Sequence, residues 1–239
     1  MRLSAKTILV TGGTDGIGLA LARRLKLAGS TVIVVGRNAE RLAAAGAESF
    51  EAIEADLSSE AGCTALLAKV ADRQIDILIN NAGMGAAFDV TAPIDMADVD
   101  RSIFLNLNAP IRLIAGMLDP LRNRPEAMIV NVTSGLAIAP SAKAPVYCAT
   151  KAGLRSFTTA LREQLSGTKI HVLEVLPPVV ETRMTEANPH KKMPASECAR
   201  QIVSAMEKGR DQANVGMTAL LYAAYNISPA IARRVMLRY

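Results

Sequence analysis

A tyrosine and a lysine four residues apart carry the chemistry that this sequence offers most directly. In a helix, the spacing of Tyr147 and Lys151 places both side chains on one face, one turn apart. A nearby ammonium favours the phenolate, so we expect the pKa of Tyr147 to lie below its reference value of about 10. Such a tyrosine could exchange a proton near neutral pH, and Ser134 could hydrogen-bond the same substrate oxygen. The alternative is a surface tyrosine beside an ordinary solvated lysine.

A glycine-rich turn near the start of the chain is the second candidate. Gly12, Gly16 and Gly18 lie between an apolar run and a segment with helical periodicity. Glycines there permit a tight turn and close backbone approach, and the following helix offers N–H groups to a pyrophosphate. The spacing G-x3-G-x-G differs from the generic G-x-G-x-x-G. By itself, this segment could be no more than a turn.

The residues after the second expected strand indicate which dinucleotide the chain prefers. Asp or Glu at this place holds the ribose hydroxyls of NAD, whereas Arg accommodates the 2′-phosphate of NADP. The chain has Gly36 and Arg37 with no acid, which favours NADP(H) and keeps NAD(H) as the alternative. Asp15 opposes this interpretation, because a carboxylate in the phosphate loop repels a phosphate unless it faces solvent or caps the helix.

Polar residues also follow other expected strands. Asp56 could accept a hydrogen bond from an adenine amino group, or it could be an ordinary turn residue. The segment Asn80-Asn81-Ala82-Gly83 could line the cofactor, or it could form a simple turn. Asn106 lies in an apolar run, where it could hold a water of a proton relay or serve a structural role, since buried amides need partners.

Segments typical of strands and helices alternate along the chain. We expect strands at residues 6–11, 31–35, 50–54, 76–79, 127–132 and 169–176. Helices are expected near residues 19–28, 39–45, 95–105, 106–122, 147–165 and 194–208, and from a cap at residues 58–59 to about 72. The tail should form a short strand and two short helices separated at Pro229. This alternation predicts an α/β fold, a Rossmann-like doubly wound parallel sheet with helices on both faces, in a single domain over residues 1–239. Ligands bind at the carboxyl ends of such strands, where the candidates above cluster.

Composition narrows the classes of function. Half of the 239 residues are hydrophobic, only 3% are aromatic, and the net charge is +5. The basic residues are scattered and lack stacking aromatics, so we expect no nucleic-acid partner. Three cysteines without CxxC spacing and two histidines without ligand spacing predict neither a disulfide framework nor a metal site. Without a signal peptide or an unbroken apolar span, the expectation is a cytoplasmic protein with no integral membrane segment.

Five motifs in order resemble those of the short-chain dehydrogenase/reductase family, in its compact single-domain form. Thr11-Gly12-x3-Gly16-Ile17-Gly18 resembles the family's cofactor loop, and residues 80–83 resemble its fourth-strand motif. Residues 177–182 resemble its P-G-x-V-x-T motif. The catalytic tetrad is matched, with serine thirteen residues before tyrosine, by Asn106, Ser134, Tyr147 and Lys151. The resemblance covers nearly the whole chain.

The resemblance implies a role for each of these residues. Tyr147 would be the general acid/base, Lys151 would lower its pKa and bind the nicotinamide ribose, and Ser134 would orient the carbonyl or hydroxyl. Asn106 would support a water relay to Lys151. The cofactor-binding residues expected in total are Gly12, Thr14, Asp15, Gly16, Ile17, Gly18, Arg37, Asp56, Leu57, Asn81, Ala82, Gly83, Tyr147, Lys151, Pro177, Val180 and Thr182. A homodimer or homotetramer, formed through the helices near residues 106–122 and 145–165, is also implied.

Two departures from the family pattern affect these expectations. Pro178 replaces the usual glycine and removes an N–H, so a backbone contact to the carboxamide has to come from Val180. The Leu-Pro-Pro form resembles a branch named for its link to lipoteichoic-acid D-alanylation, a label that says little about substrate. The chain also lacks the Gly-Gly ending of the family's ketoacyl-carrier-protein reductases. It ends in a basic amphipathic tail (231–239), expected at a subunit interface or over the substrate pocket, with membrane-surface contact as the alternative.

Together, the residues and the resemblance predict an NAD(P)(H)-dependent oxidoreductase that prefers NADP(H). Hydride would pass between the nicotinamide and a small or medium-sized carbonyl or alcohol substrate. Residues about 178–198 would form a substrate loop, and residues about 217–239 a C-terminal helical tail. One alternative is a 3-oxoacyl reductase, with Lys191 and Lys192 facing an acidic carrier. Another is a non-catalytic cofactor-binding scaffold or regulator, against which the intact set of Ser134, Tyr147 and Lys151 argues.

Overall fold

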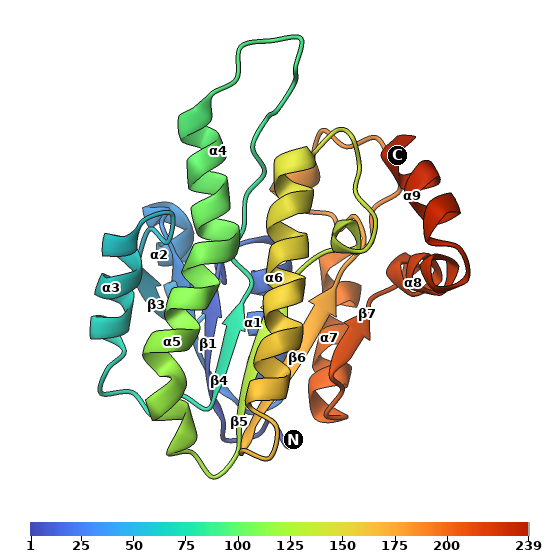
Figure 1. Cartoon of the computed structure of the whole chain (residues 1–239). Helices are drawn as coiled ribbons and strands as arrows, with labels where there is room; N and C mark the ends of the chain where they lie inside the picture. The colour runs from blue at the N-terminus through green and yellow to red at the C-terminus, as the bar shows by residue number, and fades with distance from the viewer. Residues whose placement is uncertain (239) are drawn as a thin grey trace.

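A parallel β-sheet with helices on both faces forms the centre of the molecule (Figure 1). A computed structural model of the chain describes residues 1–238. Within these residues, seven strands follow the order β3-β2-β1-β4-β5-β6-β7, and each neighbouring pair is parallel. The strands are β1 Thr7–Thr11, β2 Thr31–Gly36, β3 Glu51–Glu54, β4 Ile77–Asn80, β5 Ala127–Val132, β6 Ile170–Leu176 and β7 Gln212–Asn214. The order reverses direction between β1 and β4, the point at which such sheets bind their ligands.

The helices cover the sheet in two layers. They are α1 Gly16–Leu27, α2 Ala39–Ala47, α3 Glu60–Lys69, α4 Met96–Ile103, α5 Ala109–Arg122, α6 Pro145–Gln164, α7 Ala195–Glu207, α8 Met217–Ile227 and α9 Pro229–Arg238. Side chains of α1 and α7 share one apolar core with the sheet, and side chains of α3, α5 and α6 share the other. In Figure 1, α5 and α6 lie in front of the sheet and α7 behind it.

The central strands are apolar on both faces, as a doubly covered parallel sheet requires. In β1, Ile8 and Val10 point into the core shared with α1 and α7, whereas Leu9 points into the opposite core. All three are fully buried. Because successive side chains of a strand alternate between faces, a continuous apolar run fills both cores at once. The predicted doubly wound fold is confirmed.

The predicted element ends differ from the structure by up to three residues, and the most informative difference lies between α4 and α5. We expected one helix to end near residue 105 and another to begin at residue 106. A π-helical turn, Phe104–Asn108, instead joins α4 to α5 without a break in the helical path. Such turns insert one extra residue into a helix and often occur at functional sites. The tail forms the expected strand and two helices, β7, α8 and α9, although Tyr239 lies outside the described residues.

Membrane and metal features were also considered. Among residues 1–238, no helix combines the length and the apolar character needed to cross a bilayer. The same residues contain no group of three or more His, Cys, Asp or Glu side chains placed to hold a metal ion.

Helix α1 packs closely on the glycine turn at Gly18, so a substitution of Gly18 tests this packing. A Cβ at Gly18 would overlap the carbonyl oxygen of Gly12 and lie 2.5 Å from the Asn81 amide nitrogen. We expect Gly18→Ala to push α1 outward and lower the free energy of unfolding by at least about 2 kcal/mol. Gly46→Ala is the matched control, since nothing lies within 4 Å of its added Cβ. It should raise stability by about 0.5 kcal/mol. Urea unfolding would measure both, and equal stabilities would contradict the close packing.

Candidate active site

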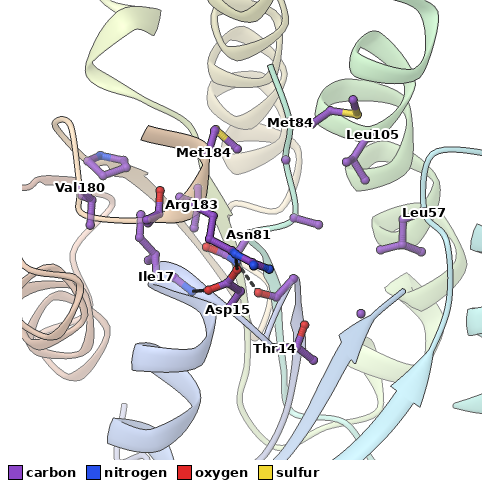
Figure 2. Close-up of a pocket in the computed structure, with 18 of the residues that line it drawn as sticks. Thr14, Asp15, Ile17, Leu57, Asn81, Met84, Leu105, Val180, Arg183 and Met184 are labelled. Atoms are coloured by element: carbon purple, nitrogen blue, oxygen red, sulfur yellow. Dashed lines mark hydrogen bonds and ion pairs between the residues drawn. The ribbon is translucent and has the colours of Figure 1, made fainter. Parts of the chain in front are cut away.

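A cavity of about 360 Å³ opens at the carboxyl ends of the central strands. Residues from the glycine turn, from the ends of β2 to β6 and from the first turns of α6 line it (Figure 2). Of the predicted site residues, only Gly18 and Asn106 do not line the cavity. The remaining predicted residues in its wall are Gly12, Thr14, Asp15, Gly16, Ile17, Arg37, Asp56, Leu57, Asn81, Ala82, Gly83, Ser134, Tyr147, Lys151, Pro177, Val180 and Thr182.

The glycine turn and the segment after β4 lock each other in place. The Asn81 side-chain amide donates to the carbonyls of Thr11 and Gly12 at 3.0 and 3.2 Å. The backbone N–H groups of Asn81 and Ala82 each donate to Thr11 Oγ1 at 3.0 Å. Gly12 and Gly16 have φ values of +63° and +52°, a region that other residues rarely adopt. A Cβ at Gly12 would lie 2.9 Å from Ala82 Cα. The two motifs therefore form one rigid unit.

This unit fits a dinucleotide phosphate. A turn that contains three glycines leads directly into the N-terminus of α1, whose free N–H groups suit an anion. Thr182 covers the turn from the loop after β6, because a Cβ at Gly16 would lie 2.8 Å from the Thr182 methyl group. The backbone at this end of the cavity is therefore open to a ligand and enclosed by a loop.

The contacts of the Asp15 carboxylate reduce the repulsion between its negative charge and an anionic ligand. Its Oδ1 accepts a hydrogen bond from Gly16 N at 2.8 Å and so caps α1. Its Oδ2 lies 3.5 Å from Arg41 Nη1 and 4.0 Å from Arg183 Nε. Figure 2 shows Asp15 and Arg183 facing each other. The carboxylate is therefore a helix cap with two arginines beside it, which is the exception considered in the sequence analysis.

Two arginines, rather than one, line the end of the cavity next to β2. Arg37 Nη1 lies 3.7 Å from Asp56 Oδ1, and Arg41 reaches the same cavity from the first turn of α2. Within residues 1–238, Arg41 Nε is buried without a hydrogen-bond partner. Sequence reasoning missed Arg41. The available signal was Asn38, whose side chain caps α2 by accepting from Arg41 N at 2.9 Å and so places Arg41 in the first helical turn.

Asp56 lies at the end of β3 with one carboxylate oxygen already occupied. Burial acts to raise its pKa, but hydrogen bonds from Ser58 N and Oγ and the charge of Arg37 hold that pKa below its ordinary value. Asp56 is therefore an anion at neutral pH, and its second oxygen is the one available to an incoming hydrogen-bond donor.

Ser134, Tyr147 and Lys151 meet at the other end of the cavity. Ser134 follows β5 and accepts a hydrogen bond from Leu136 N at 3.1 Å. Tyr147 lies in the first turns of α6, hydrogen-bonded to Ser134. Lys151 is only 3% exposed, and its ammonium donates to Val132 O at 2.8 Å. The ammonium lies 5.7 Å from the centre of the Tyr147 ring. The predicted pairing on one helix face is present.

The expected low pKa of Tyr147 is not found in the protein alone. Burial raises the pKa of Tyr147 to about 12, and the hydrogen bond with Ser134 only partly opposes it. Burial also lowers the pKa of Lys151 to about 8, because the charged amine loses hydration. The prediction considered only the attraction between cation and phenolate. Desolvation outweighs it here, so Tyr147 is a protonated phenol at neutral pH.

The Asn106 side chain does not line the cavity and instead forms hydrogen bonds with other segments of the protein. It is fully buried in the π-helical turn, and its Oδ1 accepts from Met84 N at 2.9 Å. Its Nδ2 donates to Met84 O at 2.7 Å and to Thr150 Oγ1 at 3.1 Å. The side chain therefore fixes the segment after β4 against α6. The role of Asn106 in a water relay stays a prediction.

Further residues line the cavity that were not predicted as site residues. On the loop side are Arg183 and Met184, and on the opposite side are Met84 and Leu105 (Figure 2). Met84 directly follows the Asn80–Gly83 motif, so its position in sequence was the available signal. Pro178, noted as a departure from the family pattern, also lines the cavity. The loop after β6 closes on itself through a bridge between Val180 and Met193.

Comparisons of sequence identify the family of this chain. A family model described as short chain dehydrogenase matches residues 6–193. The chain is 40% identical over 197 residues to the uncharacterized oxidoreductase DltE of Bacillus subtilis (strain 168), covering 80% of this chain and 78% of that protein. It is 36% identical over 184 residues to serine 3-dehydrogenase of Agrobacterium fabrum, covering 75% of this chain and 74% of that protein. The chain belongs to the short-chain dehydrogenase family, as its motifs predict.

Solved structures show the same fold. A short-chain dehydrogenase from Burkholderia cenocepacia J2315, solved with NADP, has a TM-score of 0.88 at 23% identity, with 100% of both chains covered. A short-chain dehydrogenase from Sphingobium yanoikuyae, solved with NADPH, has a TM-score of 0.84 at 27% identity, covering 95% of this chain and 94% of that one. With its family membership, the chain is classed as a nicotinamide-dependent oxidoreductase.

The low pKa of Lys151 predicts a pH dependence of stability in the cofactor-free protein. Between about pH 8 and 10.5 the unfolded chain binds a proton that the folded chain does not, so the free energy of unfolding contributed by Lys151 rises with pH. The gain should reach roughly 3 kcal/mol across that range. Lys151→Met removes it, so the advantage of wild type over the variant in thermal unfolding should grow from pH 7 to 10. Lys208→Met, at an exposed lysine, is the control with a flat difference. A flat difference for Lys151→Met too would refute the buried-amine argument.

Proposed function

We propose that this chain is a carbonyl reductase or alcohol dehydrogenase that prefers NADP(H) and uses Tyr147 as its general acid/base. One observation carries the proposal. A single cavity joins the hydrogen-bonded Ser134, Tyr147 and buried Lys151 at one end to a glycine turn and two arginines at the other. The first end suits proton transfer to a carbonyl oxygen, and the second suits the phosphates of a dinucleotide.

The cofactor end is assigned residue by residue. The backbone of residues 12–18 and the N-terminus of α1 would hold the pyrophosphate. Arg37 and Arg41 would hold the 2′-phosphate of NADP(H), and Asp56 would accept from the adenine amino group. Leu57 and the segment from Asn81 to Gly83 would line the cofactor between the two ends. The NADPH found in the Sphingobium relative supports this preference.

When bound, NADP(H) supplies the hydride, and the side chains of this chain position the substrate and handle the proton. In the reducing direction, Ser134 donates a hydrogen bond to the carbonyl oxygen and Tyr147 gives that oxygen its phenolic proton. A pKa of about 12 keeps Tyr147 protonated before the step, which suits a general acid. The Lys151 ammonium then stabilises the phenolate and binds the nicotinamide ribose. Pro177, Val180 and Thr182 would enclose the nicotinamide from the loop side.

The cavity wall next to the reacting end favours a substrate with apolar groups. Met84, Pro178 and Met184 contribute apolar side chains to the wall. Residues about 178–198 would form the substrate loop, and the Val180–Met193 bridge supports this by holding the loop over the cavity. Methionine side chains adapt to irregular ligands, so several medium-sized carbonyl compounds should fit. The relative named serine 3-dehydrogenase supports a hydroxyl-bearing reduced form of the substrate.

The remaining parts of the proposal concern the whole molecule. Residues 1–239 would act as one cofactor-binding domain, with residues about 217–239 as its helical tail. We expect a cytoplasmic homodimer or homotetramer formed through α5 and α6. The family resemblance supports this assembly.

Replacing the proposed acid tests the mechanism directly. Tyr147→Phe removes the transferable proton and keeps the ring, so kcat/KM for a carbonyl substrate found by NADPH consumption should fall roughly 10²–10⁴-fold. NADPH binding, followed by nicotinamide fluorescence, should stay near the wild-type value. Tyr222→Phe is the matched control, because Tyr222 lies on α8, its ring packs against Arg155 of α6, and it does not line the cavity. Near-normal turnover by Tyr147→Phe would exclude Tyr147 as the acid.

Cofactor preference is tested at the two arginines. Arg37→Ala and Arg41→Ala each remove a cation facing the proposed 2′-phosphate, so each should raise the Kd for NADPH about tenfold, or roughly 1.4 kcal/mol. The Kd for NADH should stay nearly unchanged. Arg73→Ala serves as the control, since Arg73 pairs with Glu51 and does not line the cavity. Equal losses for NADH and NADPH would show that neither arginine reads the 2′-phosphate.

A further inference from the structure

The last two helices form a basic and apolar arm at one edge of the molecule. We define the C-terminal arm as residues 217–238, which comprise α8 and α9, shown in red beyond β7 in Figure 1. The arm contains Arg233, Arg234 and Arg238 and no Asp or Glu. Among the described residues, eleven large hydrophobic side chains are exposed, and six of them lie in the arm. These six are Met217, Leu220, Ile227, Ile231, Val235 and Leu237.

Both helices of the arm expose large apolar side chains. In α8, the buried residue is the polar Thr218, whereas Leu220 and Ile227 face outward, with Ile227 86% exposed. In α9, Ile231 is 66% exposed and forms one helix face with Val235 and with Arg234 and Arg238. The outward surface of the arm is therefore a mixture of large apolar side chains and guanidinium groups.

The arm is docked on the protein rather than detached from it. The Tyr222 ring lies 5.8 Å from the guanidinium carbon of Arg155 on α6. Thr218 packs at Gly135, where a Cβ would lie 3.0 Å from the Thr218 hydroxyl. Ala142 N donates to Leu237 O at 3.4 Å.

The two helices of the arm are also tied to each other. Arg233 on α9 donates to the Tyr225 hydroxyl of α8 at 2.7 Å and lies 5.4 Å from the centre of its ring. Outward exposure of the apolar residues is therefore a property of the folded arm and not of a frayed end.

We propose that the C-terminal arm binds the surface of a membrane that contains anionic lipids. Helices with exposed apolar side chains and arginines on one face lie in the headgroup region, where the apolar groups enter the acyl boundary and the cations meet lipid phosphates. Charge favours this occupant over a second copy of the arm. Contact between two identical arms would oppose arginines to arginines, and the arm carries no carboxylate to pair with them.

Binding through the arm would also bring the membrane surface close to the cavity. Thr218 touches Gly135, which directly follows Ser134 in the chain. A membrane surface held by the arm would therefore lie close to the loop that carries Ser134. The inference concerns where the protein binds and does not depend on the proposed reaction.

Co-sedimentation of the full chain with vesicles tests the proposal. Wild type should bind vesicles of phosphatidylcholine with one quarter phosphatidylglycerol, and bind pure phosphatidylcholine vesicles far less. Arg234→Glu with Arg238→Glu should lower the partition coefficient at least about tenfold, because two charges change sign and the surface loses about four units of positive charge. Leu220→Ser with Val235→Ser should lower it by a similar factor, since the apolar contribution is lost.

Matched variants separate the arm from general charge and hydrophobicity. Lys208→Glu with Arg210→Glu makes the same change of net charge at the far end of α7, and Leu27→Ser with Val90→Ser removes two exposed apolar groups elsewhere. Both controls should bind like wild type. The proposal fails if wild type ignores anionic vesicles, or if controls and arm variants lose binding equally. It also fails if the Leu220→Ser, Val235→Ser variant dissociates an oligomer in light scattering while vesicle binding is unchanged.

Discussion

The ends of β1 and β4 are held together by one side-chain amide, and the site depends on that link. Asn81 donates to the carbonyls of Thr11 and Gly12, at the point where the strand order reverses. Leaving a buried acceptor unpaired costs about 1–3 kcal/mol, so hydrogen bonds to these carbonyls stabilise the turn. With the link made, the turn keeps its positive φ at Gly12, and α1 can approach through Gly18. The phosphate end of the cavity is therefore set before any ligand is bound.

The reacting end of the cavity differs from the glycine turn, because burial there shifts the pKa values of two titratable groups. Lys151 is almost fully buried with its ammonium on Val132 O, and burial lowers its pKa to about 8. Tyr147 is kept neutral by the same low polarity. The buried Lys151 ammonium is therefore placed where folding alone would not favour it. Groups with shifted pKa values of this kind concentrate at functional sites.

The strands and the Tyr147–Lys151 pair could be predicted from the sequence, because local residue patterns determine them. Continuous apolar runs followed by glycine or asparagine located the strands, and a four-residue spacing located Tyr147 and Lys151 on one helix face. Features that depend on burial or on contacts between distant residues could not be predicted from the sequence. The pKa of Tyr147 depends on burial, which no spacing reports, and Arg41 reaches the cavity only because Asn38 begins α2 at that residue. The π-helical turn at Asn106 is fixed by contacts with Met84 and Thr150, which are distant in sequence.

Asp15 shows why a charge read from sequence can mislead about a ligand. Its nearest cations, Arg41 and Arg183, lie 3.5 and 4.0 Å away, and all three side chains are partly exposed to solvent. Ion pairs of that length and exposure contribute little, typically about 0–1 kcal/mol. A phosphate could therefore recruit either arginine at small cost, while Asp15 keeps its hydrogen bond from Gly16 N and continues to cap α1. The carboxylate lies beside two cations without binding them tightly, and because two arginines outnumber one carboxylate, the surroundings of the glycine turn stay positive.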